Sequence, residues 1–170
     1  MLIPADKTRT AAVLLLLIDK PEIEIIFTQR SSFVQNHKQQ VSFPGGAVED
    51  EDADLFHTAL RESCEEIHVC SDSIKFVGSL PIFKTHYGLN IYPFVASVKS
   101  HEINSMHANE EVDAIFTVPL DWLRSEENWY LQDYLSPEGM HRQIVFYQPY
   151  QGYQIWGITA AILHDFLKIA

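Results

Sequence analysis

The run AAVLLLLI, residues Ala11–Ile18, constrains the fold more than any other feature of this sequence. Its consecutive apolar residues are too few to span a bilayer, which needs about 20 of them. The polar segment DKPEIE follows directly, without the small-residue cleavage site of a signal peptide. A strand buried on both sides hides such a run from water, so we expect Ala11–Ile18 to form a core strand.

Further elements are expected along the chain from periodicity and from turn residues. Pro21 marks a turn, and the apolar residues over 23–27 predict a second strand that pairs with the first as a hairpin. Pro44-Gly45-Gly46 is expected to form a tight turn. Other strands are expected over 40–43, 74–80, 90–98, 112–118, 143–147 and 153–156, and helices over 53–67, 119–123 and 158–169. This order predicts an α/β fold, a mixed sheet sandwiched between helices, and the length of 170 residues fits one domain over 1–170.

The composition limits the partners of the chain. The chain has 23 acidic and 12 basic residues, a net charge of -11, which argues against nucleic-acid binding through a basic face. An anionic substrate would need a bound cation. The two cysteines, Cys64 and Cys70, show no disulfide framework, so we expect a reducing cytoplasm, with Cys64 as a small core residue of the long helix. No membrane partner is expected.

Three glutamates crowd the end of the long helix. Glu62, Glu65 and Glu66 are spaced i, i+3 and i+4, which places them on one helix face. Like charges at this spacing destabilise a helix by a few tenths of a kcal/mol per pair, and the helix dipole disfavours anions near the C-terminus. A solvated acidic face is the ordinary interpretation. Because Arg61 offsets only part of this charge, a divalent cation is the alternative that we favour.

These residues resemble the Nudix box, whose pattern is Gly-x5-Glu-x7-Arg-Glu-x2-Glu-Glu-x-Gly. The sequence has Gly46-x5-Asp52-x8-Arg61-Glu62-x2-Glu65-Glu66-x-His68. The spacing before Arg61 is one residue longer, as in the coenzyme A pyrophosphatase branch of Nudix hydrolases. The upstream segment IFTQRSSFVQNHKQQVSFPGG (Ile26–Gly46) resembles the signature of that branch, except that Gln35 and Gln39 stand where it usually has Arg and Gly. The segments EEVDAIFTVPL and YQIWGITAAIL also resemble this branch.

The resemblance implies a Nudix-type α/β/α sandwich with a mixed β-sheet and a pyrophosphohydrolase dependent on Mg²⁺ or Mn²⁺. The implied reaction cleaves the diphosphate of coenzyme A or acyl-CoA to 3′,5′-ADP and (acyl-)4′-phosphopantetheine. Gln35 and Gln39 leave open another nucleoside diphosphate derivative, such as ADP-ribose or a dinucleotide. A catalytically silent nucleotide-binding domain is a third alternative, disfavoured because all three box glutamates are present. The resemblance also allows a homodimer.

Roles for single residues follow from the same resemblance. The implied metal ligands are Glu62, Glu65, Glu66 and the backbone carbonyl of Gly45. Arg61 is expected to orient a glutamate through a charge-assisted hydrogen bond. The proton acceptor is one of Glu65, Glu66, Glu110 and Glu111, with Glu66 and Glu111 ranked slightly higher. Arg30, His37 and Lys38 are expected to contact the substrate phosphates.

Overall fold

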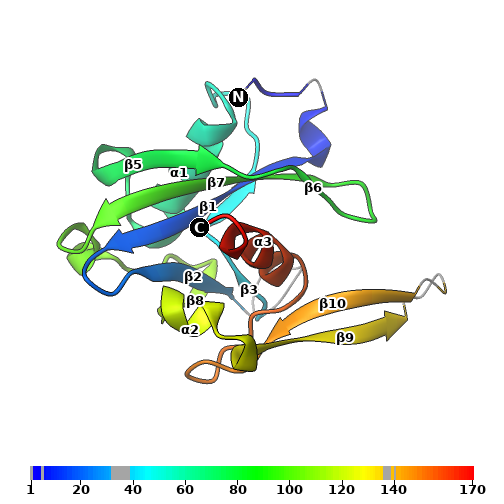
Figure 1. Cartoon of the computed structure of the whole chain (residues 1–170). Helices are drawn as coiled ribbons and strands as arrows, with labels where there is room; N and C mark the ends of the chain where they lie inside the picture. The colour runs from blue at the N-terminus through cyan, green and yellow to red at the C-terminus, as the bar shows by residue number, and fades with distance from the viewer. Residues whose placement is uncertain (1, 5, 32–38, 136–138, 140) are drawn as a thin grey trace.

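The computed structural model describes the chain except for residues 1, 5, 32–38, 136–138 and 140. Figure 1 labels its elements. The strands are β1 (Thr10–Asp19), β2 (Glu24–Arg30), β3 (Val41–Ser42), β4 (Gly45–Ala47), β5 (Ile74–Ser79), β6 (Phe83–Lys84), β7 (Asn90–Lys99), β8 (Val112–Pro119), β9 (Trp129–Leu135) and β10 (His141–Tyr147). The α-helices are α1 (Leu55–Ile67), α2 (Leu120–Arg124) and α3 (Gly157–Leu167).

The apolar run forms β1, the central strand of a mixed sheet. The main path of this sheet is β3-β2-β1-β7-β5, and β4, β6 and β8 pair with β1, β7 and β2. β1 pairs in parallel with β7 along its whole length, from Thr10 opposite Asn90 to Asp19 opposite Lys99, whereas the other pairings are antiparallel. The predicted core strand and its hairpin with β2 are confirmed. In the part of the chain that the structure describes, no helix is long and apolar enough to cross a bilayer.

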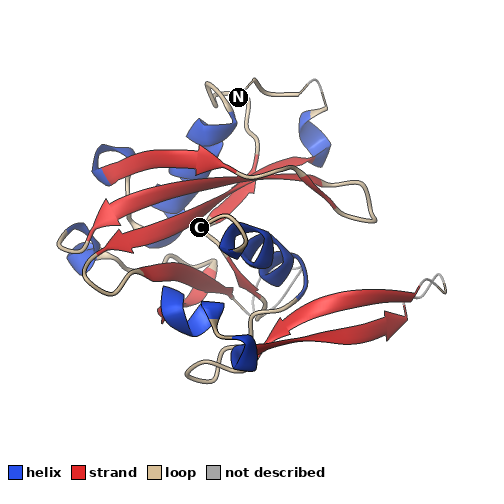
Figure 2. Cartoon of the chain, in the orientation of Figure 1, coloured by secondary structure: helices blue, strands red, loops and turns tan. Residues whose placement is uncertain are grey.

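Alternate residues of β1 enter two different cores, because successive side chains of a strand point to opposite faces of the sheet. Leu14 and Leu16 pack in one core with Ala59 of α1. Leu15 packs in the other core with Leu163 of α3. Figures 1 and 2 show α1 behind the sheet and α2 and α3 on the near side. The chain therefore has the α/β/α sandwich that the sequence predicted.

The structure corrects the prediction in three segments. Gly45-Gly46 does not form a turn: after Pro44 the chain continues as β4, which pairs with residues 11–13 of β1. The predicted strand over 153–156 makes only the isolated bridges Tyr150 to Tyr153 and Phe146 to Trp156. Strand β9 was not predicted, because it is mostly exposed and its apolar residues do not alternate with polar ones. It forms with β10 a separate hairpin that projects from the body of the molecule (Figure 2).

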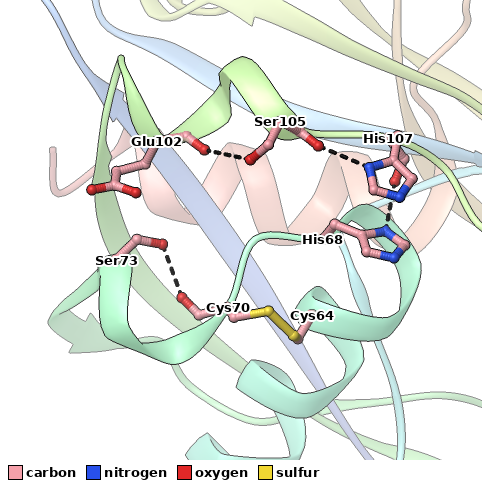
Figure 3. The surroundings of a disulfide bond; sticks show 7 residues. All are labelled: Cys64, His68, Cys70, Ser73, Glu102, Ser105 and His107. Atoms are coloured by element: carbon pink, nitrogen blue, oxygen red, sulfur yellow. Dashed lines mark hydrogen bonds between the residues drawn. A yellow bond between two sulfur atoms is a disulfide. The ribbon is translucent and has the colours of Figure 1, made fainter.

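The prediction of a free Cys64 in the core is wrong. Cys64, in the last turns of α1, is half-buried and forms a disulfide with the exposed Cys70 (Figure 3). The two residues are 6 positions apart and their Cα atoms are 4.4 Å apart. Close pairs of this kind give no framework pattern in the sequence, because the bond depends on how the chain turns after the helix. That turn is made by His68, which ends the helix in the left-handed conformation with φ 58°.

The spacing of Phe56, Leu60, Ser63, Cys64 and Ile67 predicts one buried face of helix α1, and the structure buries only part of it, at Ser63 and Ile67. The apolar positions Phe56, Leu60 and Cys64 are only partly buried. The buried residues of the helix are Leu55, Thr58, Ala59, Ser63, Glu66 and Ile67. Small side chains at this face let the helix approach β4 closely, and Glu66 is carried inward with them. A carboxylate therefore lies on the buried side of the helix.

Candidate active site

Two glycines of β4 form the floor on which the box glutamates rest. The amide of Gly45 donates a hydrogen bond to Oε2 of Glu66, at 3.2 Å. The carboxylate of Glu62 lies so close to Gly46 that a methyl group on Gly46 would clash with it, and one on Gly45 would clash with the carbonyl of Ala12. Gly45 is therefore required by the backbone, whereas a side chain at Gly46 would displace the Glu62 carboxylate.

Glu62 and Glu66 are the desolvated carboxylates of this site. The side chain of Glu66 is only 4% exposed. Burial, helped by repulsion from Glu62, raises the pKa of Glu66 to about 7, although the hydrogen bond from Gly45 opposes the shift. Burial also raises the pKa of Glu62, and the neighbouring Arg61 only partly opposes this. Buried anions at close range with too few cations form a site that favours an added positive charge.

Arg61 is held by a buried carboxylate from the start of the box. Its Nε donates to Oδ1 of Asp52 at 3.0 Å and its Nη2 to Oδ2 at 3.2 Å. Asp52 also accepts hydrogen bonds from the amide of Glu49 and the hydroxyl of Thr58, at 2.9 Å and 2.8 Å. Burial raises the pKa of Asp52, but these hydrogen bonds outweigh it and hold the pKa well below its usual range. This anchored ion pair fixes the position of the guanidinium.

The anchored guanidinium in turn orients two glutamates. Nη1 of Arg61 donates to Oε1 of Glu62 and to Oε2 of Glu65, at 3.1 Å each, and Nη2 donates to the carbonyl of Ala47 at 3.0 Å. Glu65 is more than half exposed and lies on the outer side of Glu62. The guanidinium thus links Glu62 and Glu65 to Asp52 and to the end of β4.

A second wall faces α1 from strands β2 and β8. Nη1 of Arg30 lies 3.8 Å from Oε1 of Glu66, and Nη2 lies 4.0 Å from Oε2 of Glu111. Arg30 lies at the end of β2, where the register of β2 against β8 shifts between Gln29 and Arg30. Glu111 is the one of the two adjacent glutamates that faces Arg30, whereas Glu110 is exposed and enters no interaction described for the site.

The donor set fits a divalent cation, although its side chains have not converged. Glu62 and Glu66 supply buried carboxylate oxygens, and Glu65 and Glu111 supply exposed ones at the same edge. Hard cations bind such oxygens. Among the described residues, no three His, Cys, Asp or Glu side chains are grouped closely enough to hold an ion as they stand. A cation held by Glu62 and Glu66 would therefore require rotation of one or more of these side chains.

The structure brings together some of the predicted site residues and leaves others undescribed. The structure brings together Glu62, Glu65, Glu66, Arg61, Gly45, Arg30 and Glu111. His37 and Lys38, together with Gln35, lie outside the described residues. The anchoring roles of Asp52, Thr58 and Gly46 were not predicted. Their signal in the sequence was the position of Asp52 and Gly46 within the box, which relates them to Arg61 and the glutamates but does not say how they touch.

Comparisons of the sequence identify the family of the chain. The family model described as the NUDIX domain matches residues 7–138. A protein of Photorhabdus laumondii named Uncharacterized Nudix hydrolase NudL is 36% identical over 162 residues, which are 95% of this chain and 84% of that protein. The protein of the same name from Pectobacterium atrosepticum is 35% identical and covers similar shares of both chains.

Solved structures share the fold at low sequence identity. A binary complex of the C. elegans Ap4A hydrolase superposes with a TM-score of 0.55 at 18% identity. The match covers 65% of this chain and 80% of that one. The NUDIX domain of Shewanella oneidensis NrtR, complexed with ADP ribose, gives a TM-score of 0.50 at 16% identity and covers 66% of this chain and 73% of that one. At such identities the likeness supports the fold alone.

Proposed function

The chain belongs to the NUDIX family and is a Nudix pyrophosphohydrolase, and we propose that its substrate is coenzyme A or an acyl-CoA. The proposed products are 3′,5′-ADP and (acyl-)4′-phosphopantetheine. The observation that supports this substrate most directly is the arrangement of the segment over 26–46, which resembles the coenzyme A branch. Its residue Arg30 and its terminal Gly45-Gly46 meet on opposite sides of Glu66. Arg30 and Gly45, near the two ends of the segment, therefore both lie beside Glu66, where we propose that the diphosphate binds.

Nudix enzymes generally need divalent ions, and we propose that Glu62 and Glu66 hold Mg²⁺ or Mn²⁺ here, with Glu65 and the Gly45 carbonyl as further ligands. Bound there, the ion would neutralise the diphosphate and make a water more acidic. Arg61, anchored by Asp52, holds the carboxylates of Glu62 and Glu65 through hydrogen bonds. The Gly45 amide holds Glu66 in place.

We propose Glu111 as the proton acceptor, with Glu66 acting as a ligand. A base must be able to reach water and must not be consumed as a ligand, and Glu111 is 60% exposed on the wall opposite α1. As the water oxygen bonds to one phosphorus, its proton passes to the Glu111 carboxylate, and the bridging oxygen leaves with the other phosphorus. Arg30 is the cation available on this wall for the leaving phosphate, and His37 and Lys38 are proposed to assist it.

A substrate panel tests this proposal. The protein is incubated with Mg²⁺ or Mn²⁺ and with coenzyme A, acetyl-CoA, ADP-ribose, NADH and diadenosine tetraphosphate, and the products are resolved. Preferential formation of 3′,5′-ADP from the coenzyme A compounds is expected. Cleavage of ADP-ribose or the dinucleotides, with coenzyme A compounds untouched, would select the alternative left open by Gln35 and Gln39. No cleavage with either ion would instead point to a silent nucleotide-binding domain.

Two variants separate the roles of the glutamates. Glu111→Gln should lower turnover by about 10²–10⁴-fold, as for loss of a general base, while Mn²⁺ affinity stays near that of the wild type. Glu66→Gln should weaken Mn²⁺ binding itself, by about 10–100-fold or more. Equal loss of Mn²⁺ affinity in both variants would mean that Glu111 is a ligand and that the base must be sought elsewhere.

The remaining expectations on setting are also proposals. A small-molecule diphosphate is the proposed partner, and light scattering would test the homodimer. A cytoplasmic location is proposed because the two cysteines show no disulfide framework in the sequence. The disulfide between them in the structure argues against this location, since disulfides are rare in a reducing cytosol. Thiol labelling of the protein in freshly quenched cells would determine whether Cys64 and Cys70 are reduced there.

A further inference from the structure

We propose that Arg30 is an exchangeable counter-ion that couples cation binding to diphosphate binding. In this proposal its guanidinium neutralises Glu66 and Glu111, gives up Glu66 to a divalent cation, and then binds the substrate diphosphate. The inference rests on the proposed function, because it takes a cation and a diphosphate as the ligands of this site. It does not depend on whether the diphosphate belongs to coenzyme A.

The backbone of Arg30 is fixed, so any exchange must be made by its side chain. The amide of Arg30 donates to the carbonyl of Gln40 at 3.0 Å, and its own carbonyl accepts from the amide of Gln39 at 3.1 Å. On the other side, the amide of Ser31 donates to the carbonyl of Glu111 at 2.8 Å. These bonds tie the end of β2 to both neighbouring segments and leave a long side chain pointing from a rigid base.

The guanidinium of Arg30 is held far more loosely than that of Arg61. Arg61 donates hydrogen bonds of 3.0 to 3.2 Å to Asp52, Glu62, Glu65 and Ala47. Arg30 approaches its two carboxylates only to 3.8 and 4.0 Å, beyond hydrogen-bond length, and its side chain is 29% exposed. Its interaction with the described residues of this site is therefore one of charge, which a stronger charge can replace.

Arg30 faces the oxygen of Glu66 that does not accept the hydrogen bond from Gly45. Oε2 of Glu66 accepts the hydrogen bond from the Gly45 amide, whereas Oε1 is the oxygen nearest Arg30. A divalent ion ligated by Oε1 would be a second positive charge beside the guanidinium, whose Nη1 lies 3.8 Å from that oxygen. At a partly buried site this repulsion would lower the affinity for the ion by roughly several-fold to tenfold or more. Binding of the ion therefore drives the guanidinium away from Glu66.

The displaced guanidinium stays at the same edge of the site, because its backbone does not move. A diphosphate bound to the cation would offer it oxygens that favour bidentate hydrogen bonds. The cation thus frees Arg30 for the substrate, and the substrate removes the charge that opposes the cation. Two ligands that help each other in this way show positive coupling, and the coupling must be equal in both directions.

The test measures Mn²⁺ affinity of the full chain by calorimetry, first without and then with a saturating ADP analogue whose bridging oxygen is replaced by methylene and which cannot be hydrolysed. Without the analogue, Arg30→Ala should bind Mn²⁺ about tenfold more tightly than the wild type, because a nearby positive charge is gone. With the analogue, the wild type should gain more affinity than Arg30→Ala, so that the difference narrows or reverses.

Two controls make the result specific. Arg30→Lys keeps the charge and should stay near the wild type, and Lys75→Ala removes the same charge from β5, at the opposite edge of the sheet, and should leave Mn²⁺ affinity unchanged. A purely structural role for Arg30 would weaken Mn²⁺ binding on its removal. Unchanged or weaker binding, no binding by any of these proteins, or an equal effect of the analogue on wild type and Arg30→Ala would each overturn the proposal. None of these readings depends on which substrate is cleaved.

Discussion

Arg61 and Asp52 form a bidentate ion pair in which the fully buried Asp52 carboxylate fixes the guanidinium. The guanidinium in turn orients Glu62 and Glu65. Removing the charge of Asp52 leaves Arg61 without its anchor and disturbs Glu62 and Glu65 through it. We expect Asp52→Asn to lower the free energy of unfolding by about 3 kcal/mol, the usual cost of breaking a buried pair, and to reduce turnover. Urea unfolding measures the first effect.

Asp50→Asn is the control, because it alters a carboxylate that is 90% exposed, and it should change stability by less than about 0.5 kcal/mol. Equal losses of stability in Asp52→Asn and Asp50→Asn would show that burial of the pair is unimportant.

Gly46 gives the second prediction, because its missing side chain makes room for the Glu62 carboxylate. Gly46→Ala should push Glu62 away from its place beside Arg61 and weaken Mn²⁺ affinity by about 10–100-fold, as when the support of a ligand is lost. Calorimetric titration with Mn²⁺ measures this. Gly78→Ala is the matched control, since a methyl group at Gly78 would meet nothing within 4 Å. An unchanged Mn²⁺ affinity in Gly46→Ala would remove Glu62 from the ligand set.

The raised pKa of Glu66, about 7, predicts how stability changes with pH. Between the ordinary pKa of a glutamate near 4.5 and pH 7, the folded protein keeps a proton that the unfolded chain has lost. Stability therefore falls as the pH rises through this window, and the full cost remains above pH 7. Glu66→Gln removes this cost, so with chelator present it should be more stable than the wild type at pH 8 by roughly 3 kcal/mol at most.

The advantage of Glu66→Gln should disappear near pH 4.5, where Glu66 is protonated in both folded and unfolded chains. It should also shrink or reverse when Mn²⁺ is added, because ligand binding stabilises only the protein that binds it. Thermal unfolding at pH 4.5, 6 and 8, with chelator or with Mn²⁺, gives the comparison. The prediction would be contradicted if the difference in stability between the wild type and Glu66→Gln did not change between pH 5 and 7.5.

The fold was predictable where burial left a clear pattern in the sequence. The uninterrupted apolar run of β1 specifies a strand covered on both faces, and the observed alternation of Leu14 and Leu15 between two cores follows from it. Strand β9 lacked such a pattern because its hairpin pairs only with β10 and leaves most side chains exposed. Local pairing through the backbone then decides the structure, and side-chain hydrophobicity carries little information.

The sequence indicated which acidic residues would lie close together, but not the geometry of the site. The spacing of Glu62, Glu65 and Glu66 identified the acidic face from residues close in sequence. The burial of Glu66 could not be anticipated, since a charged residue is ordinarily placed toward solvent. The approach of Arg30 to Glu66 depends on the register of β2 against β8 and on how the sheet packs against α1, which are relations between distant segments.

The disulfide between Cys64 and Cys70 predicts a sensitivity to reductant. It closes a short loop that contains His68 (Figure 3). The amide of His68 donates to the Cys64 carbonyl at 3.1 Å. The chain-entropy model assigns about 2 kcal/mol to a loop of this length. Dithiothreitol and Cys70→Ser should each lower the free energy of unfolding by this amount. Dithiothreitol should have no further effect on Cys70→Ser, and a wild type indifferent to reductant would mean that the bond adds no stability.

Gln39 gives the last prediction, because it is one of the positions where this sequence departs from the coenzyme A branch that it resembles. Gln39 has φ 57°, in the left-handed region that favours glycine, and the branch usually has Gly at this position. The left-handed conformation of Gln39 therefore destabilises the folded protein at this position, just before β3. Gln39→Gly should stabilise the protein by about 1 kcal/mol, measured by urea unfolding, with little change in turnover. Gln40→Gly, next to it without a positive φ, should destabilise instead. A large change in substrate preference in Gln39→Gly would show that its side chain contacts the substrate.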